Sequence, residues 1–137
     1  DFRTDLNDCG LVNMKPVHLH QILQNLITNA IHAMEGKGRL TVTIRCSVKN
    51  GAAEKDRQTK PTGRYAIVSV EDTGCGISDR NINRIFEPFF TTKDVGLGTG
   101  LGLYIVHNLV KKYNGEIQVR SHPGEGTVLQ IFLPIME

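Results

Sequence analysis

Apolar residues recur along the chain with two different spacings, and each spacing predicts one kind of secondary structure. From Val17 to Met34 they recur at positions i, i+3, i+4 and i+7, which is the spacing of an amphipathic helix. Pro16 fits the first turn of this helix, and Gly36 supplies its stop. A second helix is predicted from Leu101 to Tyr113, and a short one from Asp79 to Ile85. The chain is therefore predicted to contain three helices.

Alternation of apolar and polar residues predicts the strands. It occurs from Leu40 to Ile44, from Tyr65 to Glu71, from Ile117 to Val119 and from Val128 to Leu133, and the residues around Val12 resemble a further first strand. Two of these strands are adjacent at the end of the chain. This order of elements favours an α+β layered domain with a mixed sheet over a doubly wound α/β fold.

Length and composition are those of one folded domain. The chain has 137 residues, of which 39% are hydrophobic and 22% charged, so disorder is excluded as the main state. The formal net charge is +2 and no block of Lys or Arg stands out, which gives nucleic-acid binding no electrostatic support. The apolar runs are far shorter than the roughly 18–20 residues of a membrane span. Because the chain begins at Asp1 rather than at Met, a fragment of a longer protein is expected.

The three cysteines are Cys9, Cys46 and Cys75. An odd number without CxxC spacing argues against a disulfide framework or a zinc site. Reduced thiols are the simplest expectation.

Three polar residues of the first helix, Asn25, Asn29 and His32, fall within about 60° of one another and away from its apolar stripe. Such a face is either solvated or a ligand-binding surface. Asparagine offers a neutral oxygen to a hard cation and an NH₂ donor to phosphate.

Glycines gather in one part of the chain, since six of the 14 lie between Gly74 and Gly102. The first group follows a predicted strand in the sequence Asp72-Thr73-Gly74-Cys75-Gly76. This is either a turn that ends the strand or a carboxylate at the mouth of a pocket, where it accepts a hydrogen bond from an exocyclic amine.

The second glycine group, from Gly96 to Leu103, leads into a helix. It is either a flexible linker or a phosphate cradle, because backbone N–H groups at a helix N-terminus attract anions. It follows no strand and lacks the GxxxxGK[ST] pattern, so it matches neither the dinucleotide fingerprint nor the P-loop.

The sequence from Phe86 to Lys93 holds three of the five phenylalanines, and core packing under a loop explains part of it. Lys93 adds a cation suited to phosphate charge. The sequence from Gly124 to Thr127 reads as a hairpin turn.

Taken in order, these segments resemble the ATP-binding catalytic domain of sensor histidine kinases, within the gyrase, Hsp90, histidine kinase and MutL superfamily. NLITNAIHAM is similar to the N box, DTGCGI to the first glycine box, FEPFFTTK to the phenylalanine box, GLGTGLGL to the second glycine box and GEGT to the final glycine-threonine element. The FFTTK form is most similar to kinases of the nitrogen-regulation and sporulation type. The resemblance implies that residues 1–137 form a single domain with the Bergerat-type fold. That fold is a two-layer α/β sandwich with a mixed, mostly antiparallel sheet and three helices on one face.

The resemblance also implies ATP and Mg²⁺ as cofactors and assigns residues to them. Asp72 would accept a hydrogen bond from the adenine amino group, Thr127 would support a water network there, and Asn29 would ligate Mg²⁺. The implied nucleotide-binding residues are Asp72, Gly74, Gly76, Ile77, Phe90, Gly98, Gly100, Leu101, Gly102 and Thr127. The implied catalytic residues are Asn25, Asn29, His32 and Lys93.

One departure from the wider superfamily is informative. Hydrolysing members carry Glu where this chain has Asn25, and an amide cannot act as the general base for water. The resemblance therefore implies transfer of the γ-phosphoryl group to a histidine, supplied by a separate dimerisation domain that is expected to be absent here. Two alternatives stay open: a serine kinase of the anti-sigma-factor type, and an ATP-driven clamp of the gyrase, Hsp90 or MutL type.

The expected partners are the protein's own dimerisation and phospho-acceptor domain and, downstream, a response-regulator receiver domain. Neither nucleic acid nor membrane contact is expected of this domain. A cytoplasmic location is expected for it, whether or not the parent protein is anchored in a membrane.

Overall fold

The computed structural model describes residues 2–6, 14–49, 63–90 and 101–135. In chain order the elements are β1 (Phe2–Leu6), α1 (Pro16–Met34), β2 (Leu40–Lys49), β3 (Gly63–Asp72), α2 (Gly102–Lys112), β4 (Glu116–His122) and β5 (Gly126–Pro134). The two long predicted helices and the four later predicted strands are confirmed. The strand expected around Val12 lies outside the described residues.

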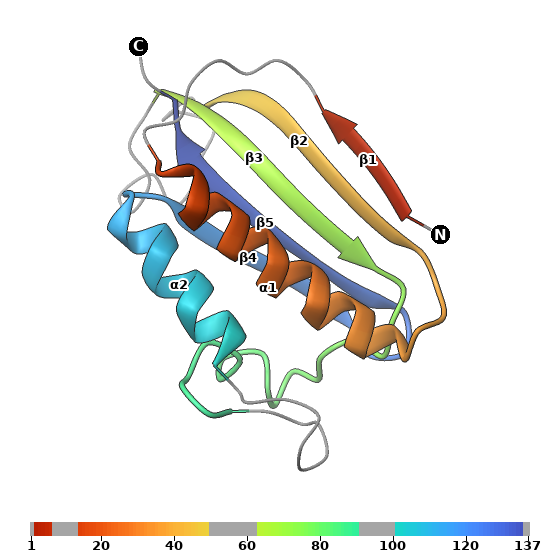
Figure 1. Ribbon diagram of the computed structural model, residues 1–137. Coiled ribbons are helices and arrows are strands. Elements are labelled where there is room, and N and C mark those ends of the chain that lie inside the picture. The colour runs from red at the N-terminus through yellow and green to blue at the C-terminus, as the bar shows by residue number, and fades with distance from the viewer. Residues whose placement is uncertain (1, 7–13, 50–62, 91–100, 136–137) are drawn as a thin grey trace.

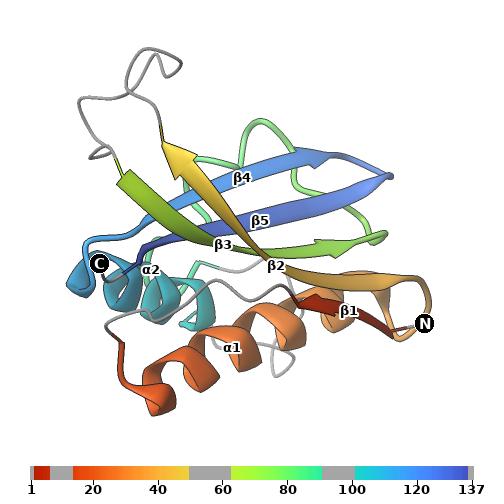
Figure 2. The same cartoon turned by 90° about the horizontal axis from the view of Figure 1, so that it is seen from above.

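The strands form one sheet in the order β1-β2-β3-β5-β4. β1 runs parallel to β2, whereas the other three neighbouring pairs are antiparallel, so the expected mixed, mostly antiparallel sheet is confirmed. Both helices lie side by side on the same face of the sheet (Figures 1 and 2). The described residues thus form two layers, and the last strand, β5, lies between β3 and β4.

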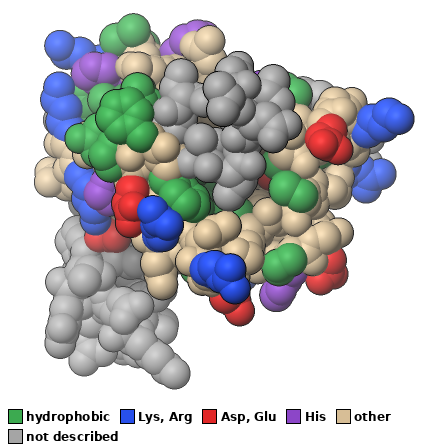
Figure 3. Space-filling view, turned by 90° about the horizontal axis from the view of Figure 1, so that it is seen from below, with side chains coloured by type: hydrophobic (Ala, Val, Ile, Leu, Met, Phe, Trp, Pro, Cys, Tyr) green, Lys and Arg blue, Asp and Glu red, His purple; other side chains and the backbone are tan. Residues whose placement is uncertain are grey.

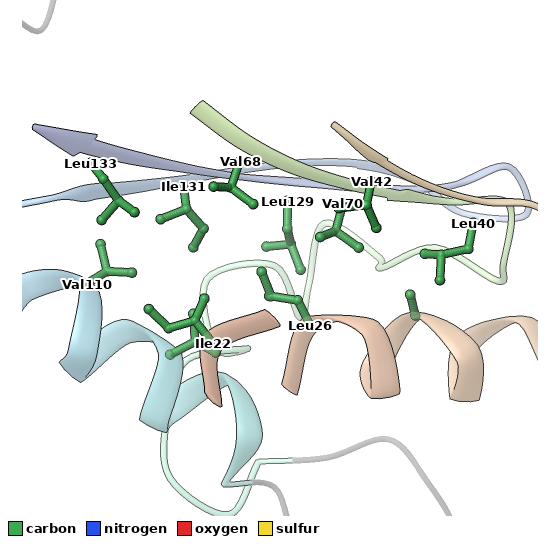
Figure 4. Close-up of a cluster of buried hydrophobic side chains, with 12 residues drawn as sticks. Ile22, Leu26, Leu40, Val42, Val68, Val70, Val110, Leu129, Ile131 and Leu133 are labelled. Atoms are coloured by element: carbon green, nitrogen blue, oxygen red, sulfur yellow. The ribbon is translucent and has the colours of Figure 1, made fainter. Parts of the chain in front are cut away.

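The core lies between these layers (Figure 4). On α1, Ile22 and Leu26 are buried at a spacing of one helical turn, as the periodicity predicts. They face apolar side chains from alternate positions of the strands, among them Val70 and Ile131. Each such side chain contributes roughly 1.5–3 kcal/mol when fully buried. This packing fixes the rotation of α1 about its own axis, and so determines where its polar face points.

The third predicted helix is not formed. Residues 78–87 make successive turns, with backbone bonds from Asn81 to Ser78, from Arg84 to Asn81 and from Glu87 to Arg84. Asparagine and aspartate side chains compete for backbone hydrogen bonds, which disfavours a continuous helix in so short a segment. The expectation of three helices on one face is therefore wrong for the described residues, which contain two.

The two described cysteines, Cys46 and Cys75, differ in oxidation state. Cys75 is an exposed free thiol, as expected. Cys46 is disulfide-bonded, so the expectation of reduced thiols is wrong for this residue.

The surface matches the near-neutral charge of the chain. Figure 3 shows basic and acidic side chains interspersed over one face of the molecule, without a continuous region of one sign. Among the described residues, neither helix combines the length and apolarity needed to cross a bilayer.

The core position of Ile131 gives a test of this packing. The side chain is fully buried, with 0% of its surface exposed, so we expect Ile131→Ala to lower the free energy of unfolding by about 2–5 kcal/mol. Urea denaturation measures the change. Arg120→Ala, at an exposed position of the neighbouring strand, serves as control and should change stability by no more than about 0.5 kcal/mol. A loss at Ile131 as small as at Arg120 would contradict the layered core.

Candidate functional site

The site begins at Asp72, the last residue of β3. The residue is 7% exposed and lies opposite Thr127 in the pairing of β3 with β5. The backbone N–H of Gly74 donates a hydrogen bond of 2.8 Å to Asp72 Oδ1. β3 ends here because the chain turns back on this carboxyl group, as the turn interpretation of DTGCG predicts.

The surroundings of Asp72 alter its acidity. Burial raises the pKa of the carboxyl group, and the nearby charge of Glu71 acts in the same direction. Hydrogen bonds from the backbone N–H groups of Gly74 and Thr127 lower the pKa and offset part of this effect. The net pKa is above the ordinary value, which identifies a carboxylate held where water solvates it poorly. Such a group gains from any ligand that donates a hydrogen bond to it.

The glycine-containing loop after Asp72 is held between α1 and the β4–β5 hairpin. Cys75 N–H donates to Ala33 O of α1 at 3.1 Å, and Gly124 N–H of the hairpin donates to Cys75 O at 2.7 Å. Gly76 has φ 76°, and a Cβ on it would collide with the carbonyl of His122. Glycine is therefore required at position 76 for both its backbone conformation and the close approach of the hairpin.

The polar face of α1 links this loop to α2. Asn25, Asn29 and Ala33 follow one another at intervals of one turn, so they share one face of the helix. At one end of this line Ala33 contacts Gly74 and Cys75, and at the other end the Asn25 side chain lies beside Gly102. Asn25 and Asn29 are half-buried. Asn29 thus lies midway between the two glycine segments, which favours the ligand-face interpretation over a solvated face.

The N-terminus of α2 completes the site. Its N-cap residue is Leu101, no side chain caps it among the described residues, and the first turn carries no acidic residue. The positive end of the helix dipole favours an anion at this position. Lys111 and Lys112 at the opposite end complement the dipole there.

The three phenylalanines of the segment from Phe86 to Phe90 differ in burial and in contacts. Phe86 packs against the core and its ring lies 5.5 Å from the ring of His107, so the core-packing interpretation is confirmed for this residue. Phe90 is half-buried, with the guanidinium of Arg84 4.6 Å from its ring centroid. Phe89 is 72% exposed and has φ 68°.

The structure brings most of the sequence-predicted residues to one region between α1, the end of β3, the start of β5 and the start of α2. These residues are Asn25, Asn29, Asp72, Gly74, Gly76, Ile77, Leu101, Gly102 and Thr127. His32 is exposed on the last turn of α1. Lys93, Gly98 and Gly100 lie outside the described residues.

The donor set for a metal is small. No group of three His, Cys, Asp or Glu side chains in the described ranges could hold a metal ion. A neutral Asn29 oxygen suits a hard cation that takes most of its ligands from water and substrate phosphates, which is the usual way proteins bind Mg²⁺. The residues present therefore fit a metal that arrives with a phosphorylated ligand.

The sequence interpretation missed Ser121. This residue lies on β4 and its hydroxyl bonds to Ile77 and Thr127, both of the site. The available signal was the alternation of β4: Ile117 and Val119 pack on the core, so period two places Ser121 on the same face. A polar residue at such a position requires partners.

Comparison with known proteins identifies the family of this arrangement. The family model described as Histidine kinase-, DNA gyrase B-, and HSP90-like ATPase matches residues 14–137. Sensor kinase CckA of Brucella abortus (strain 2308) is 44% identical over 114 residues, which are 83% of this chain and 12% of that protein. Sporulation kinase E of Bacillus subtilis (strain 168) is 33% identical over 132 residues, 96% of this chain and 16% of that protein. The resemblance inferred from the sequence is confirmed.

Solved structures show the same fold. The mycobacterial sensor histidine kinase MprB superposes with a TM-score of 0.76 at 25% identity, covering 98% of this chain and 80% of that chain. Full-length ShkA in complex with AMPPNP superposes with a TM-score of 0.69 at 28% identity, covering 97% of this chain and 25% of that chain. The expected α+β architecture of this family is confirmed, apart from the third helix.

The raised pKa of Asp72 predicts a pH dependence of stability. An unfolded aspartate titrates near pH 3.9, below the folded value, so ionisation costs the folded state more than the unfolded state. The wild type therefore loses stability, relative to Asp72→Asn, as pH rises from about 4 through the folded pKa. Urea denaturation measures the free energy of unfolding of both proteins. Between pH 4 and 7.5 we expect the stability of Asp72→Asn to rise relative to that of the wild type. A constant difference, or a shift toward the wild type, would contradict the burial of the carboxyl group.

Proposed function

The chain belongs to the histidine kinase-, DNA gyrase B- and HSP90-like ATPase family, and from this membership and its site we propose that it binds ATP with Mg²⁺ and donates the γ-phosphoryl group to a histidine. The acceptor histidine would belong to a separate dimerisation domain, and the reaction would serve two-component signal transduction. The aligned residues make up 12% of CckA and 16% of sporulation kinase E, which supports an acceptor in another part of a longer protein.

The observation that carries this proposal is the buried Asp72 carboxyl group. It is held by backbone N–H groups beside a loop whose glycines let backbone approach closely on two sides. A flat base with an exocyclic amine supplies the donor that this acceptor needs, and the amino group of adenine is such a donor. Gly74, Gly76 and Ile77 follow Asp72 in the chain and would line the base.

The opposite end of the site suits the phosphates. The N-terminus of α2 at Leu101 and Gly102 offers N–H groups and a positive dipole end to an anion. Asn29 would hold the Mg²⁺ ion, which supplies neutralisation of phosphate charge when bound, and Asn25 would assist from the same helix face. His32 would contact phosphate from the end of α1. The segment from Phe90 to Gly98 would form a lid over ATP, and Lys93 on it would also contact phosphate.

The residue at position 25 supports transfer to a protein group over hydrolysis. The side chain of Asn25 lies beside Gly102 and carries an amide, which cannot take a proton from water near neutral pH. A histidine imidazole needs no such base, so catalysis would consist of positioning and charge neutralisation. This argues against an ATP-driven clamp of the gyrase, Hsp90 or MutL type.

The partners follow from the reaction. The chain would act on its own dimerisation domain, and the phosphohistidine would pass its phosphoryl group to a response-regulator receiver domain. We place the domain in the cytoplasm, where its nucleotide substrate is found.

Substitution of the base and metal residues tests the site. We expect Asp72→Asn to weaken Mg·ATP binding about tenfold or more, because a hydrogen bond to a charged group contributes about 1.5–3 kcal/mol. Asn29→Ala should also weaken it, because it removes the side-chain oxygen that would ligate Mg²⁺. Isothermal titration calorimetry measures the affinity. Asn108→Ala, at an exposed asparagine of α2, is the matched control and should bind like the wild type. Affinities of the Asp72 and Asn29 variants equal to the control would refute the assignment.

Labelled ATP tests the phosphoryl transfer. Incubated alone, the chain should acquire no acid-labile label on its own histidines, whereas addition of the dimerisation domain of a similar kinase should allow labelling of that domain's histidine. Stoichiometric label on a histidine of the isolated chain would show that the acceptor lies within it. Label on a serine of an added partner would instead favour a serine kinase.

A further inference from the structure

Ser121 connects three parts of the site through one hydroxyl group. Ile77 N–H from the glycine-containing loop donates to Ser121 Oγ at 2.6 Å. Ser121 Oγ lies 3.0 Å from the carbonyl oxygen of Gly126 and 2.8 Å from Thr127 Oγ1. Ser121 is half-buried and Thr127 is 6% exposed, so water competes little for these bonds.

The number of protons on a hydroxyl group decides the direction of these bonds. A serine hydroxyl has one proton to donate and two lone pairs to accept with. One lone pair of Ser121 receives Ile77 N–H, and the proton goes to the Gly126 carbonyl, which can only accept. The remaining lone pair then accepts the proton of the Thr127 hydroxyl. All three bonds are formed together only when Thr127 is the donor.

This direction determines what the Thr127 hydroxyl offers to a ligand beside it. With its proton directed to Ser121, Thr127 Oγ1 presents only lone pairs elsewhere. Asp72 lies opposite Thr127 in the strand pairing, and an ionised carboxylate also only accepts. Two hydrogen-bond acceptors therefore belong to paired residues of neighbouring strands, and a ligand that meets both is favoured if it brings an amino group and disfavoured if it brings a carbonyl oxygen.

We propose that Ser121 is a positioning residue that holds the Thr127 hydroxyl as a hydrogen-bond acceptor and thereby makes the site select a 6-aminopurine nucleotide over a 6-oxopurine nucleotide. The inference rests on the proposed function, because it requires the base of ATP to lie at Asp72. Without Ser121 the Thr127 hydroxyl turns and donates to a carbonyl oxygen at purine position 6, and the penalty against a 6-oxopurine falls.

The test compares ATP with inosine triphosphate, which carries a carbonyl group in place of the amino group at position 6. Calorimetry with Mg²⁺ gives both affinities for the wild type and for Ser121→Ala. We expect the ratio of ATP affinity to inosine triphosphate affinity to fall about three- to tenfold in the variant, the effect of one hydrogen bond of about 0.5–1.5 kcal/mol. Ser121→Thr, which keeps the hydroxyl group, should retain the wild-type ratio. Arg120→Ala, on the opposite face of β4, is the control and should also retain it.

A second substitution tests whether Ser121 acts through Thr127. Thr127→Val should lower the ratio by itself, and Ser121→Ala added to Thr127→Val should lower it no further, because the hydroxyl that Ser121 orients is already gone. If Ser121→Ala does not fold by circular dichroism, Thr127→Val and Thr127→Ser provide the test. The ratio must then fall in Thr127→Val and be retained in Thr127→Ser.

The outcomes separate this inference from the proposed function. A Ser121→Ala variant that binds both nucleotides more weakly by the same factor has an unchanged ratio, which shows a merely structural role and overturns the inference. A wild type that binds neither nucleotide overturns the proposed function and the inference together.

Discussion

The burial of one carboxyl group constrains much of the structure around it. A buried carboxylate is costly unless hydrogen bonds compensate for the lost water, and here the compensating donors are backbone N–H groups of Gly74 and Thr127. Those donors reach Asp72 only if the chain turns immediately after β3 and if β5 pairs alongside it. This close pairing of β5 with β3 also requires glycine at position 126, since a Cβ there would collide with the Asp72 carbonyl oxygen. The buried Asp72 carboxyl group therefore depends on both the turn after β3 and the β4–β5 hairpin.

The rest of the site depends on the packing of α1. Because Ile22 and Leu26 face the sheet, Asn25 and Asn29 lie on another face of the helix, the one on which Asn25 lies beside Gly102 and Ala33 beside Gly74. The helix thus carries a core face and a ligand face at a fixed angle to each other. A loss of packing on the first face would displace the asparagines even though none of the substituted residues contacts a ligand.

The elements that the sequence predicted correctly are those with a long, regular apolar pattern. The periodicity of α1 and the alternation of β3 and β5 each extend over enough residues to outweigh local preferences. Residues 79–85 offered only a short pattern, and their asparagines favour side-chain to backbone bonds over helix, so the prediction of a helix was wrong there. The disulfide of Cys46 was missed because cysteine spacing alone says nothing of which thiols approach in space.

Among the site residues, Asp72 and Asn29 were predictable because each stands in a recognisable local sequence. Ser121 was not, since its importance lies in contacts with residues 44 and six positions away and in the direction of its hydrogen bonds. Sequence periodicity assigns a side chain to a face of the sheet. It does not say which proton goes to which oxygen.

The position of β5 has a consequence for the order in which the molecule assembles. β5 is inserted between β3 and β4, and its pairing with β3 joins residues that are 55 to 69 positions apart in the sequence. Contacts of this kind form late, because a long loop must be closed before they are gained. During synthesis, α1, β2 and β3 leave the ribosome with a vacant edge on β3, and Asp72 has no Thr127 beside it until β5 has emerged. The candidate site is therefore complete only after β5 has paired with β3, because Thr127 lies on β5 opposite Asp72.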